Sequence, residues 1–341
     1  MKIERVELIH GGGGEAMLDL IESYIIKVLG EGRLPGGVGV RDLDDGATIP
    51  LGEWEVVVTS DGYTVHPIFF PGGDIGRLAV AGAINDLSVM GARPLAVLDN
   101  LIVEEGFPVA DLEKIVKSMS STAKEAGAVI IGGDLKVMPK GRVDKIVIST
   151  TGIGIAKRGQ VITDSGLKSG DKIIVTGTIG EHEMALISVR EGIEFESEIK
   201  SDVAPIWPLI EKALEIGGLT AAKDPTRGGL AAALNEMARK SSVGIIVYES
   251  EIPIRDSVRA ASEMLGLDPL YLACEGRAVM GVKSEVADEV LEAIRSHPLG
   301  RNAAVIGEVT NDNKGLVVLE TIVGGKRLLE PPIGTPLPRV C

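Results

Sequence analysis

Alternating apolar and polar stretches divide the first half of the chain into strands and helices. Short apolar runs predict strands, and apolar positions at helical spacing predict helices. The expected strands are 56–61, 95–103, 129–134 and 145–155, and the expected helices are 16–26, 75–90 and 109–127. The polar, turn-rich residues 157–170 then predict a boundary.

The second half repeats this texture. We expect strands at 171–177, 244–248, 270–274, 278–282, 303–309 and 316–319, and helices at 181–190, 203–216, about 229–240 and 286–296. The pattern predicts an α/β (α+β) protein with two domains of similar size. We divide the chain into a Gly-rich loop and helix (1–36), an N-terminal domain (37–156), a C-terminal domain (157–330) and a tail (331–341).

The tail differs from everything before it. Pro331, Pro332, Pro336 and Pro338 favour an extended chain that forms no core, and Cys341 follows them at the tip. A frayed terminus is the ordinary interpretation of such a segment. The alternative is a swinging arm that carries a reactive thiol, because a thiolate is a good nucleophile.

Composition and charge exclude several classes of protein. Lys and Arg number 35 against 49 Asp and Glu, which gives a net charge of −14 and argues against a broad nucleic-acid surface. No apolar run reaches the roughly 18 residues of a membrane helix, and the acidic N-terminus is unlike a signal peptide. The two cysteines, Cys274 and Cys341, have no metal-ligand spacing. We therefore expect a cytoplasmic protein that binds neither nucleic acid nor membrane.

Acidic residues in loops and at strand ends are the first candidate for chemistry. Hard carboxylate oxygens together with substrate phosphates are what Mg²⁺ prefers, so a group of them predicts metal and nucleotide binding. Each acid taken alone has a simpler interpretation as a turn or cap residue. The residues are Asp44, Asp45, Asp61, Asp86, Asp134 and Asp224. Neither a phosphate-binding P-loop nor a complete dinucleotide fingerprint is present.

Two further segments carry candidate site residues. In 224–229, we expect Thr226 to cap a helix and Arg227 to offer a fork to an oxyanion, although a plain N-cap with a solvated Arg is also possible. Glu275 follows the apolar run 270–274 and is either a surface turn acid or a general base.

These segments together resemble a known family. Asp44–Ala47, Thr59–Tyr63, Phe69–Gly76, Asn85–Asp86, Gly132–Val137 and Asp224–Gly229 recur in order, and Pro338–Cys341 follows at the tail. The acidic motifs resemble the superfamily of aminoimidazole ribonucleotide synthetase, selenophosphate synthetase and thiamine-monophosphate kinase. The Phe-Phe-Pro-Gly-Gly segment and the tail resemble the HypE family of hydrogenase maturation factors.

The resemblance implies a fold, a reaction and partners. It implies a two-domain aminoimidazole-ribonucleotide-synthetase-like fold, a homodimer formed through the N-terminal sheet, and a flexible tail. In the implied reaction, HypF places a carbamoyl group on Cys341, ATP with Mg²⁺ drives its dehydration to an S-cyanide, and a HypC–HypD complex accepts the cyanide for [NiFe]-hydrogenase.

The resemblance also implies roles for particular residues. Glu275 would be the base, Lys136 would stabilise oxygen or phosphate charge, and Asp45, Asp61, Asp86 and Asp134 would hold metal or nucleotide phosphate. Asp44, Asp224, Thr226 and Arg227 would complete the nucleotide site. The alternatives are another ATP-dependent synthetase or kinase of the superfamily that acts on a small molecule, and a non-catalytic adaptor that binds ATP only as a conformational ligand.

Overall fold

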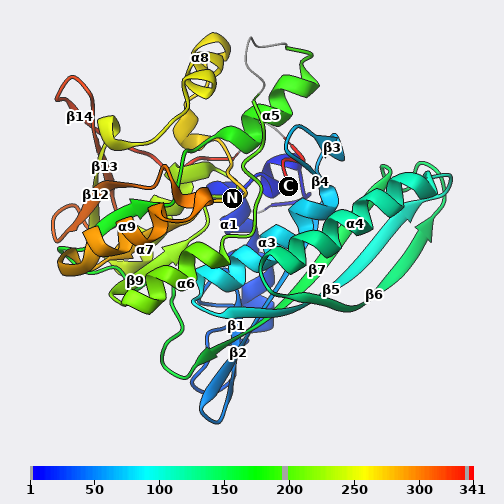
Figure 1. The fold of residues 1–341 in the computed structure, drawn as a ribbon, viewed down its shortest axis with the longest axis horizontal. Coiled ribbons are helices and arrows are strands. Elements are labelled where there is room, and N and C mark those ends of the chain that lie inside the picture. The colour runs from blue at the N-terminus through cyan, green and yellow to red at the C-terminus, as the bar shows by residue number, and fades with distance from the viewer. Residues whose placement is uncertain (1–2, 194–198, 335–337) are drawn as a thin grey trace.

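Two large β-sheets and the helices between them form the body of the molecule (Figure 1), and β3 (Phe69–Phe70) and β4 (Gly73–Asp74) pair as a third, two-stranded sheet. A computed structural model describes residues 3–193, 199–334 and 338–341. Helices and strands alternate in both halves, so the mixed α/β class predicted from the sequence is confirmed. Among the described helices, none is long and apolar enough to cross a membrane.

The N-terminal sheet has the strand order β1-β2-β7-β5-β6. Its strands are β1 (Ala47–Leu51), β2 (Trp54–Tyr63), β7 (Ile146–Lys157), β5 (Arg93–Glu104) and β6 (Val129–Met138). Along β7 every second residue is buried, as expected for a sheet with one covered face. Helices α3 (Ile75–Val89) and α4 (Val109–Glu125) cover that face, and in the described chain nothing equivalent covers the other (Figure 1).

Helix α3 is the central element of the fold. Its residues are almost all buried, because Ala, Gly, Val, Leu and Ile surround the whole helix rather than one stripe of it. Asp74 caps its start by accepting hydrogen bonds from the backbone amides of Gly76 and Arg77. Asn85, near its end, donates to the carbonyl oxygens of Ala204 and Glu275 and so ties the helix to the second half of the chain.

The C-terminal sheet has the strand order β14-β13-β10-β12-β8-β11-β9. Its strands are β14 (Lys326–Leu328), β13 (Val317–Glu320), β10 (Gly244–Tyr248), β12 (Ala304–Thr310), β8 (Lys172–Val175), β11 (Val279–Val282) and β9 (Leu219–Lys223). The surrounding helices are α5 (Glu181–Arg190), α6 (Trp207–Ile216), α7 (Gly229–Ser241), α8 (Asp256–Leu265) and α9 (Ala287–Arg295). One apolar cluster includes residues from both sheets, so the two halves share a core.

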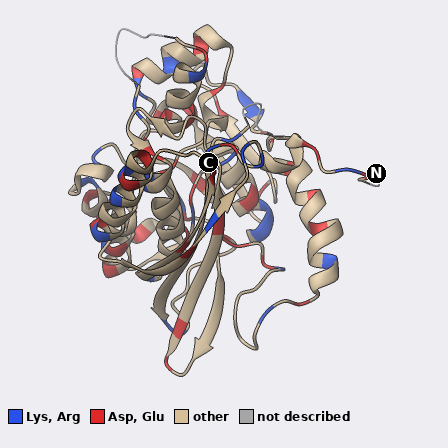
Figure 2. Cartoon of the chain, turned by 90° about the vertical axis from the view of Figure 1, so that its right-hand side faces the viewer, with Lys and Arg blue, Asp and Glu red and all other residues tan. Residues whose placement is uncertain are grey.

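The N-terminal segment lies along one side of this body (Figure 2). It forms one continuous helical stretch, α1 (Gly14–Leu20), η2 (Ile21–Ile26) and α2 (Lys27–Leu29). The backbone amides of Glu15 and Ala16 donate to the carbonyl oxygens of Pro332 and Ile333. The start of the chain is therefore hydrogen-bonded to the proline-rich segment near its end.

The sequence prediction fails at a few elements. The strand expected at 270–274 is wrong: Asp268 accepts from the backbone amide of Leu270 and starts the short turn η4 (Pro269–Tyr271), and a buried loop follows. Helix α6 begins at Trp207 rather than at 203, with Pro208 in its first turn. The sequence analysis did not predict β1, β14 or α8.

Candidate active site

Five of the predicted acids come together where the two sheets meet. Asp44 and Asp45 lie just before β1, Asp61 on β2, Asp86 on α3 and Asp224 directly after β9. Burial, together with the negative charges of Asp61, Asp224 and Asp45, raises the pKa of Asp86 well above its usual value. We call these five residues the acidic site.

Two lysines, one buried and one partly exposed, partly neutralise the acidic site. The Nζ atom of Lys223, the last residue of β9, lies 2.6 Å from Oδ1 of Asp45 and 3.4 Å from Oδ2 of Asp164. Lys240 lies 2.6 Å from the same Asp164 oxygen. The sequence analysis missed Lys223, Lys240 and Asp164, although Lys223 directly precedes a predicted acid.

The acidic site remains short of positive charge. Burial, with neighbouring carboxylates, raises the pKa of Asp44 to about 7 and that of Asp224 to about 8. Oδ2 of Asp45 is buried and has no hydrogen-bond partner among the described residues. Such a site favours an added cation, which would restore the charged form of these carboxylates.

The described residues do not form a complete metal site by themselves. Within the described residues, no three His, Cys, Asp or Glu side chains are placed to hold a metal ion together. The carboxylates nevertheless fit Mg²⁺ in part, because that ion usually takes one or two carboxylates and completes its shell with phosphate oxygens and water.

Asp134 and Lys136 lie away from the acidic site. Both are exposed on β6, at the edge of the N-terminal sheet, and their side chains pair with each other at 2.5 Å. This hydrogen bond lowers the pKa of Asp134. In a single chain, the structure therefore does not bring either residue to the predicted nucleotide site.

Glu275 lies on the buried loop after η4, beside the acidic site. Its Oε1 atom has no hydrogen-bond partner in the part of the chain that the structure describes, and burial raises the pKa of this carboxyl well above its usual range. The loop is held by its backbone: Asp202 accepts from the amides of Glu275 and Gly276, and Asn85 donates to the Glu275 carbonyl oxygen. The main chain is fixed while the carboxyl group stays available.

The tip of the tail is bound into the body of the protein. The backbone amide and the hydroxyl of Thr64 donate to the backbone oxygen of Cys341 at 3.0 Å and 3.2 Å. The backbone amide of His66 donates to the carbonyl oxygen of Arg339 at 3.2 Å. Val340 is only 3% exposed and belongs to the shared core. The expectation that the tail forms no core is therefore wrong at its tip; residues 335–337 lie outside the described chain.

Docking places Cys341 next to the residues that the sequence analysis assigned to chemistry. Burial and the negative charges of Glu275, Asp61 and Asp224 raise the pKa of its thiol to about 12, against the opposing effect of Arg227. In return, the Cys341 thiolate is the first cause of the raised pKa of Arg227. A thiol in this position stays protonated and is a poor nucleophile at neutral pH.

Arg227 and Thr226 lie on the turn that precedes α7. Arg227 donates to the carbonyl oxygen of Gly11, so it links the Gly-rich N-terminal loop to the site. The expected capping role of Thr226 is wrong: the N-cap of α7 is Gly228 in the left-handed conformation, and only the carbonyl of Thr226 is engaged, by the amide of Gly229. The Gly228 conformation ends the turn before a side-chain cap at Thr226 would be in position.

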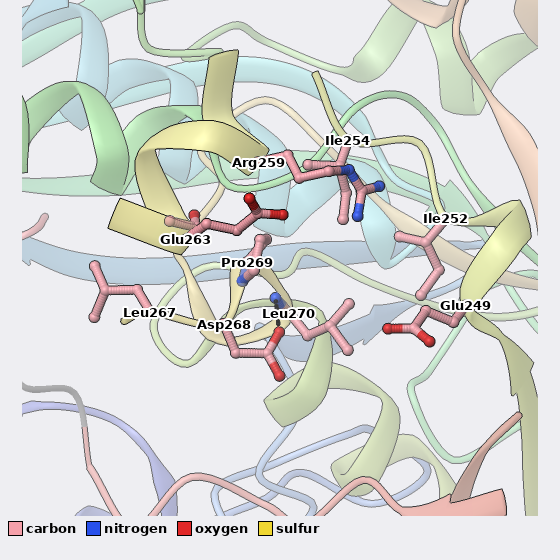
Figure 3. Close-up of a pocket in the computed structure, with 10 residues that line it drawn as sticks. Glu249, Ile252, Ile254, Arg259, Glu263, Leu267, Asp268, Pro269 and Leu270 are labelled. Carbon is pink, nitrogen blue, oxygen red and sulfur yellow. Dashed lines mark hydrogen bonds between the residues drawn. The ribbon is translucent and has the colours of Figure 1, made fainter. Parts of the chain in front are cut away.

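A small cavity of about 90 Å³ lies elsewhere in the C-terminal half (Figure 3). It is bounded by η3 (Glu249–Glu251), α8 and η4. Its lining includes Glu249, Arg259, Glu263 and Asp268 and none of the predicted site residues. None of the predicted site residues therefore lies at this cavity.

Family models define the class of protein first. The N-terminal domain of AIR synthase related proteins matches residues 43–156, and the C-terminal domain of the same proteins matches residues 168–320. The chain is thus built from the two domains of that superfamily, as its acidic motifs indicated.

Individual relatives narrow the class. A hydrogenase expression/formation protein of Methanocaldococcus jannaschii is 57% identical over 342 residues, with 100% of both chains covered. The carbamoyl dehydratase HypE of Azotobacter vinelandii is 44% identical over 337 residues, covering 98% of this chain and 97% of its own. The chain belongs to the HypE family, the carbamoyl dehydratases of hydrogenase maturation.

Two solved structures resemble the fold over most of its length. The HypE–HypF complex matches with a TM-score of 0.85 at 44% identity, covering 92% of this chain and 99% of that one. The hydrogenase maturation protein HypE in complex with ATP matches with a TM-score of 0.82 at 40% identity, covering 99% and 100%. These likenesses confirm the predicted two-domain fold.

Proposed function

We propose that this chain uses ATP to dehydrate a carboxamide carried on the sulfur of Cys341, which leaves a thiocyanate. The observation that carries the proposal is the docked tail, which places Cys341 beside Glu275, Arg227 and the acidic site. A frayed terminus would have no reason to be bound there.

The reaction balances without any further reactant. The amide oxygen attacks the γ-phosphorus of ATP and ADP leaves, which converts a poor leaving group into a phosphate. The C–O bond then breaks, phosphate departs with the former amide oxygen, and the nitrogen loses both protons as the C≡N bond forms. The products are ADP, phosphate, one released proton and the S-cyanide.

The residues of the site suit these steps. Glu275 would accept a proton from the amide nitrogen, because its Oε1 is unused by any described residue and it is electrostatically coupled to Cys341. Arg227 would stabilise the negative charge that develops on the transferring phosphoryl group or the imidate oxygen. The raised pKa of Glu275 makes it a strong base once it is ionised, and the charge of Arg227 favours that ionised form.

Mg²⁺ would be held by Asp45, Asp61 and Asp86, with Asp44, Asp224 and Thr226 completing the nucleotide site. The unpartnered Asp45 oxygen and the raised pKa values of Asp44 and Asp224 support a cation there. When bound, the ion would neutralise charge on the triphosphate.

Asp134 and Lys136 would act across a homodimer. They lie on β6, whose side chains Val129, Ile131, Leu135 and Val137 are all more than half exposed. An exposed apolar edge strand is normally covered, and a second copy of this sheet would cover it. The partner copy would then receive Asp134 as a metal or phosphate ligand and Lys136 as a charge-stabilising group.

Two encounters would precede and follow the chemistry. The structural relative bound to HypF supports HypF as the carbamoyl donor. The raised pKa of the docked thiol supports transfer at an outward position of the tail, where the thiolate forms more readily. A HypC–HypD complex would accept the cyanide, and the free thiols would be kept reduced in the cytoplasm.

Intact-protein mass spectrometry after incubation with HypF, its substrates and Mg-ATP tests the proposal. We expect a carbamoyl adduct on Cys341, and we expect this adduct to lose one water only when ATP binds to this protein. Cys341→Ser is the control and should yield no thiocyanate. An unmodified Cys341 beside an active HypF would favour a small-molecule enzyme of the superfamily or an adaptor.

A further inference from the structure

Helix α5 contacts the docked tail at both of its ends. His182 lies in its first turn and Arg190 at its last residue, and both donate hydrogen bonds to tail carbonyl groups. Neither residue belongs to the acidic site, and the reaction proposed above assigns them no part. We call His182 and Arg190 the tail clasp.

His182 is held in a single protonation state and orientation. Its ring is fully buried, and burial lowers its pKa to about 4, so it is neutral at working pH. Nε2 lies 2.9 Å from the Val340 carbonyl oxygen, which can only accept, so Nε2 carries the proton. Nδ1 is then the acceptor of the Ser201 hydroxyl at 2.7 Å.

Ser201 connects the clasp to the Phe-Phe-Pro-Gly-Gly segment. Its backbone amide donates to the Pro71 carbonyl oxygen at 2.8 Å. Gly72 has φ +95°, and a Cβ there would lie 2.7 Å from the Ser201 carbonyl oxygen, so only glycine permits this approach. The Phe70 ring meets the His182 ring edge-on at 5.4 Å. The segment thus shapes the pocket in which His182 is fixed.

Arg190 secures the tail further from its tip. Its guanidinium donates to the carbonyl oxygens of Pro338 and Arg339, and its Nε donates to that of His66. The Arg190 guanidinium therefore links the tail to the backbone at His66. The same backbone also pairs with the tail directly, since the His66 amide donates to the Arg339 carbonyl oxygen.

We propose that His182, oriented by Ser201, and Arg190 are positioning residues that hold the tail inward and so set the fraction of molecules in which Cys341 lies at the acidic site. Both bind main-chain carbonyl groups, and no hydrogen bond among the described residues holds the Cys341 side chain, which packs partly buried against the shared core. The clasp would therefore accept the tail whether its sulfur carries a proton, a carboxamide or a cyanide. The catalytic consequence rests on the proposed function, but the docking itself does not.

Alkylation of Cys341 by iodoacetamide measures docking directly, without HypF or ATP. The docked thiol is a weak nucleophile, so wild-type protein should react well below the rate of a free peptide of residues 331–341. His182→Leu removes the donor and should raise the rate about fivefold to tenfold. His182→Gln returns an N–H near the Nε2 position and should restore at least half of the protection.

Two further variants keep the test decisive. Arg190→Met should raise the alkylation rate of Cys341 by a similar factor. It remains informative if a thermal melt shows that His182→Leu is not folded. His297→Leu is the matched control, because its Nδ1 accepts from the Leu299 amide on a separate turn. Peptide mapping separates Cys341 from the buried Cys274.

The outcomes for docking and for catalysis are separate. Equal alkylation of wild type, His182→Leu and Arg190→Met, or a wild-type rate equal to that of the free peptide, would overturn the clasp. If docking behaves as expected, the clasp variants should accept carbamoyl from HypF at least as fast as wild type, because the tail is outward more often, but dehydrate it about fivefold more slowly. If wild type never loses water, the proposed function fails while the alkylation result still decides the clasp.

Discussion

The acidic site and the tail clasp are neighbours that use opposite physical means. The acidic site is built mainly from buried carboxylic acids with raised pKa values, and Lys223 lies 2.6 Å from Asp45 with both side chains 11% exposed. The tail clasp consists of a neutral histidine and one arginine. Backbone hydrogen bonds with Thr64 and His66 hold the tail beside it. A buried ion pair is costly to separate, whereas a hydrogen bond to a carbonyl group contributes about 1 kcal/mol from a neutral donor and about 1.5–3 kcal/mol from the Arg190 guanidinium. The comparison indicates that the acidic site is a permanent part of the fold, whereas the tail clasp can release the tail.

Glu275 stands where the two regions meet, and its replacement should have the largest effect. Glu275→Gln keeps the shape but removes the base, so dehydration should slow by roughly 10²- to 10⁴-fold while carbamoylation of Cys341 stays normal. Intact mass spectrometry after HypF and Mg-ATP treatment resolves the two steps. Glu251→Gln, on an exposed turn, is the matched control. Water loss at the wild-type rate would remove Glu275 from the mechanism.

Lys223 tests the permanence of the acidic site. Lys223→Met leaves the buried Asp45 without its lysine partner and Asp164 with Lys240 alone, so the free energy of unfolding should fall by about 3–5 kcal/mol. Denaturant titration measures this loss. Lys172→Met removes a half-exposed pair with Glu308 and should cost less than about 1 kcal/mol. Equal losses in the two variants would mean that burial gives Lys223 no special weight.

The pH dependence of stability should follow the same region. Burial raises the pKa of Asp224 to about 8, so its stabilising contribution is complete below its unfolded pKa and is lost as pH rises through about 8. The melting temperature of the nucleotide-free protein should therefore fall between about pH 4 and about pH 8, and Asp224 should add no further loss above that range. In Asp224→Asn, which cannot ionise, that fall should shrink by roughly 2–4 °C. An unchanged pH profile by differential scanning calorimetry would contradict this assignment.

The smallest effect should come from the tail itself. Val340→Ala removes buried methyl groups and should lower the free energy of unfolding by about 1 kcal/mol. Dehydration of the carbamoylated tail should slow by a small factor as docking weakens. Val323→Ala, at a position 92% exposed, should change neither quantity. A loss of several kcal/mol would mean that the tail is a fixed part of the core and not a releasable arm.

The sequence was sufficient to predict some of the elements that form the acidic site. Strand periodicity located β2 and helical periodicity located α3, which carry Asp61 and Asp86, but neither β1 nor β9 was predicted. Local pattern works here because each acid is fixed by the element that carries it. The failed strand at 270–274 shows the limit, since its apolar residues are buried in a loop whose turn begins at Asp268.

The lysines that neutralise the acidic site and the tail clasp could not be predicted from local sequence patterns. Lys240 and Asp164 are 76 residues apart, and His182 and Val340 are 158 apart, so only the assembled fold brings them together. Lys136 presents the complementary problem. It lies on an exposed edge strand, and its predicted role needs a second chain that one sequence does not describe.

The docking of Cys341 beside Thr64 of its own chain also has a consequence for kinetics. A reacting group joined to its own enzyme is present at an effective concentration fixed by the chain, on the millimolar scale for a short flexible connection. Its turnover should therefore be first order and independent of protein concentration, and a detached peptide would have to reach that scale to compete. Each molecule would also deliver a single product before it needs recharging, so the supply of carbamoyl groups, rather than substrate affinity, would set the pace of the whole cycle.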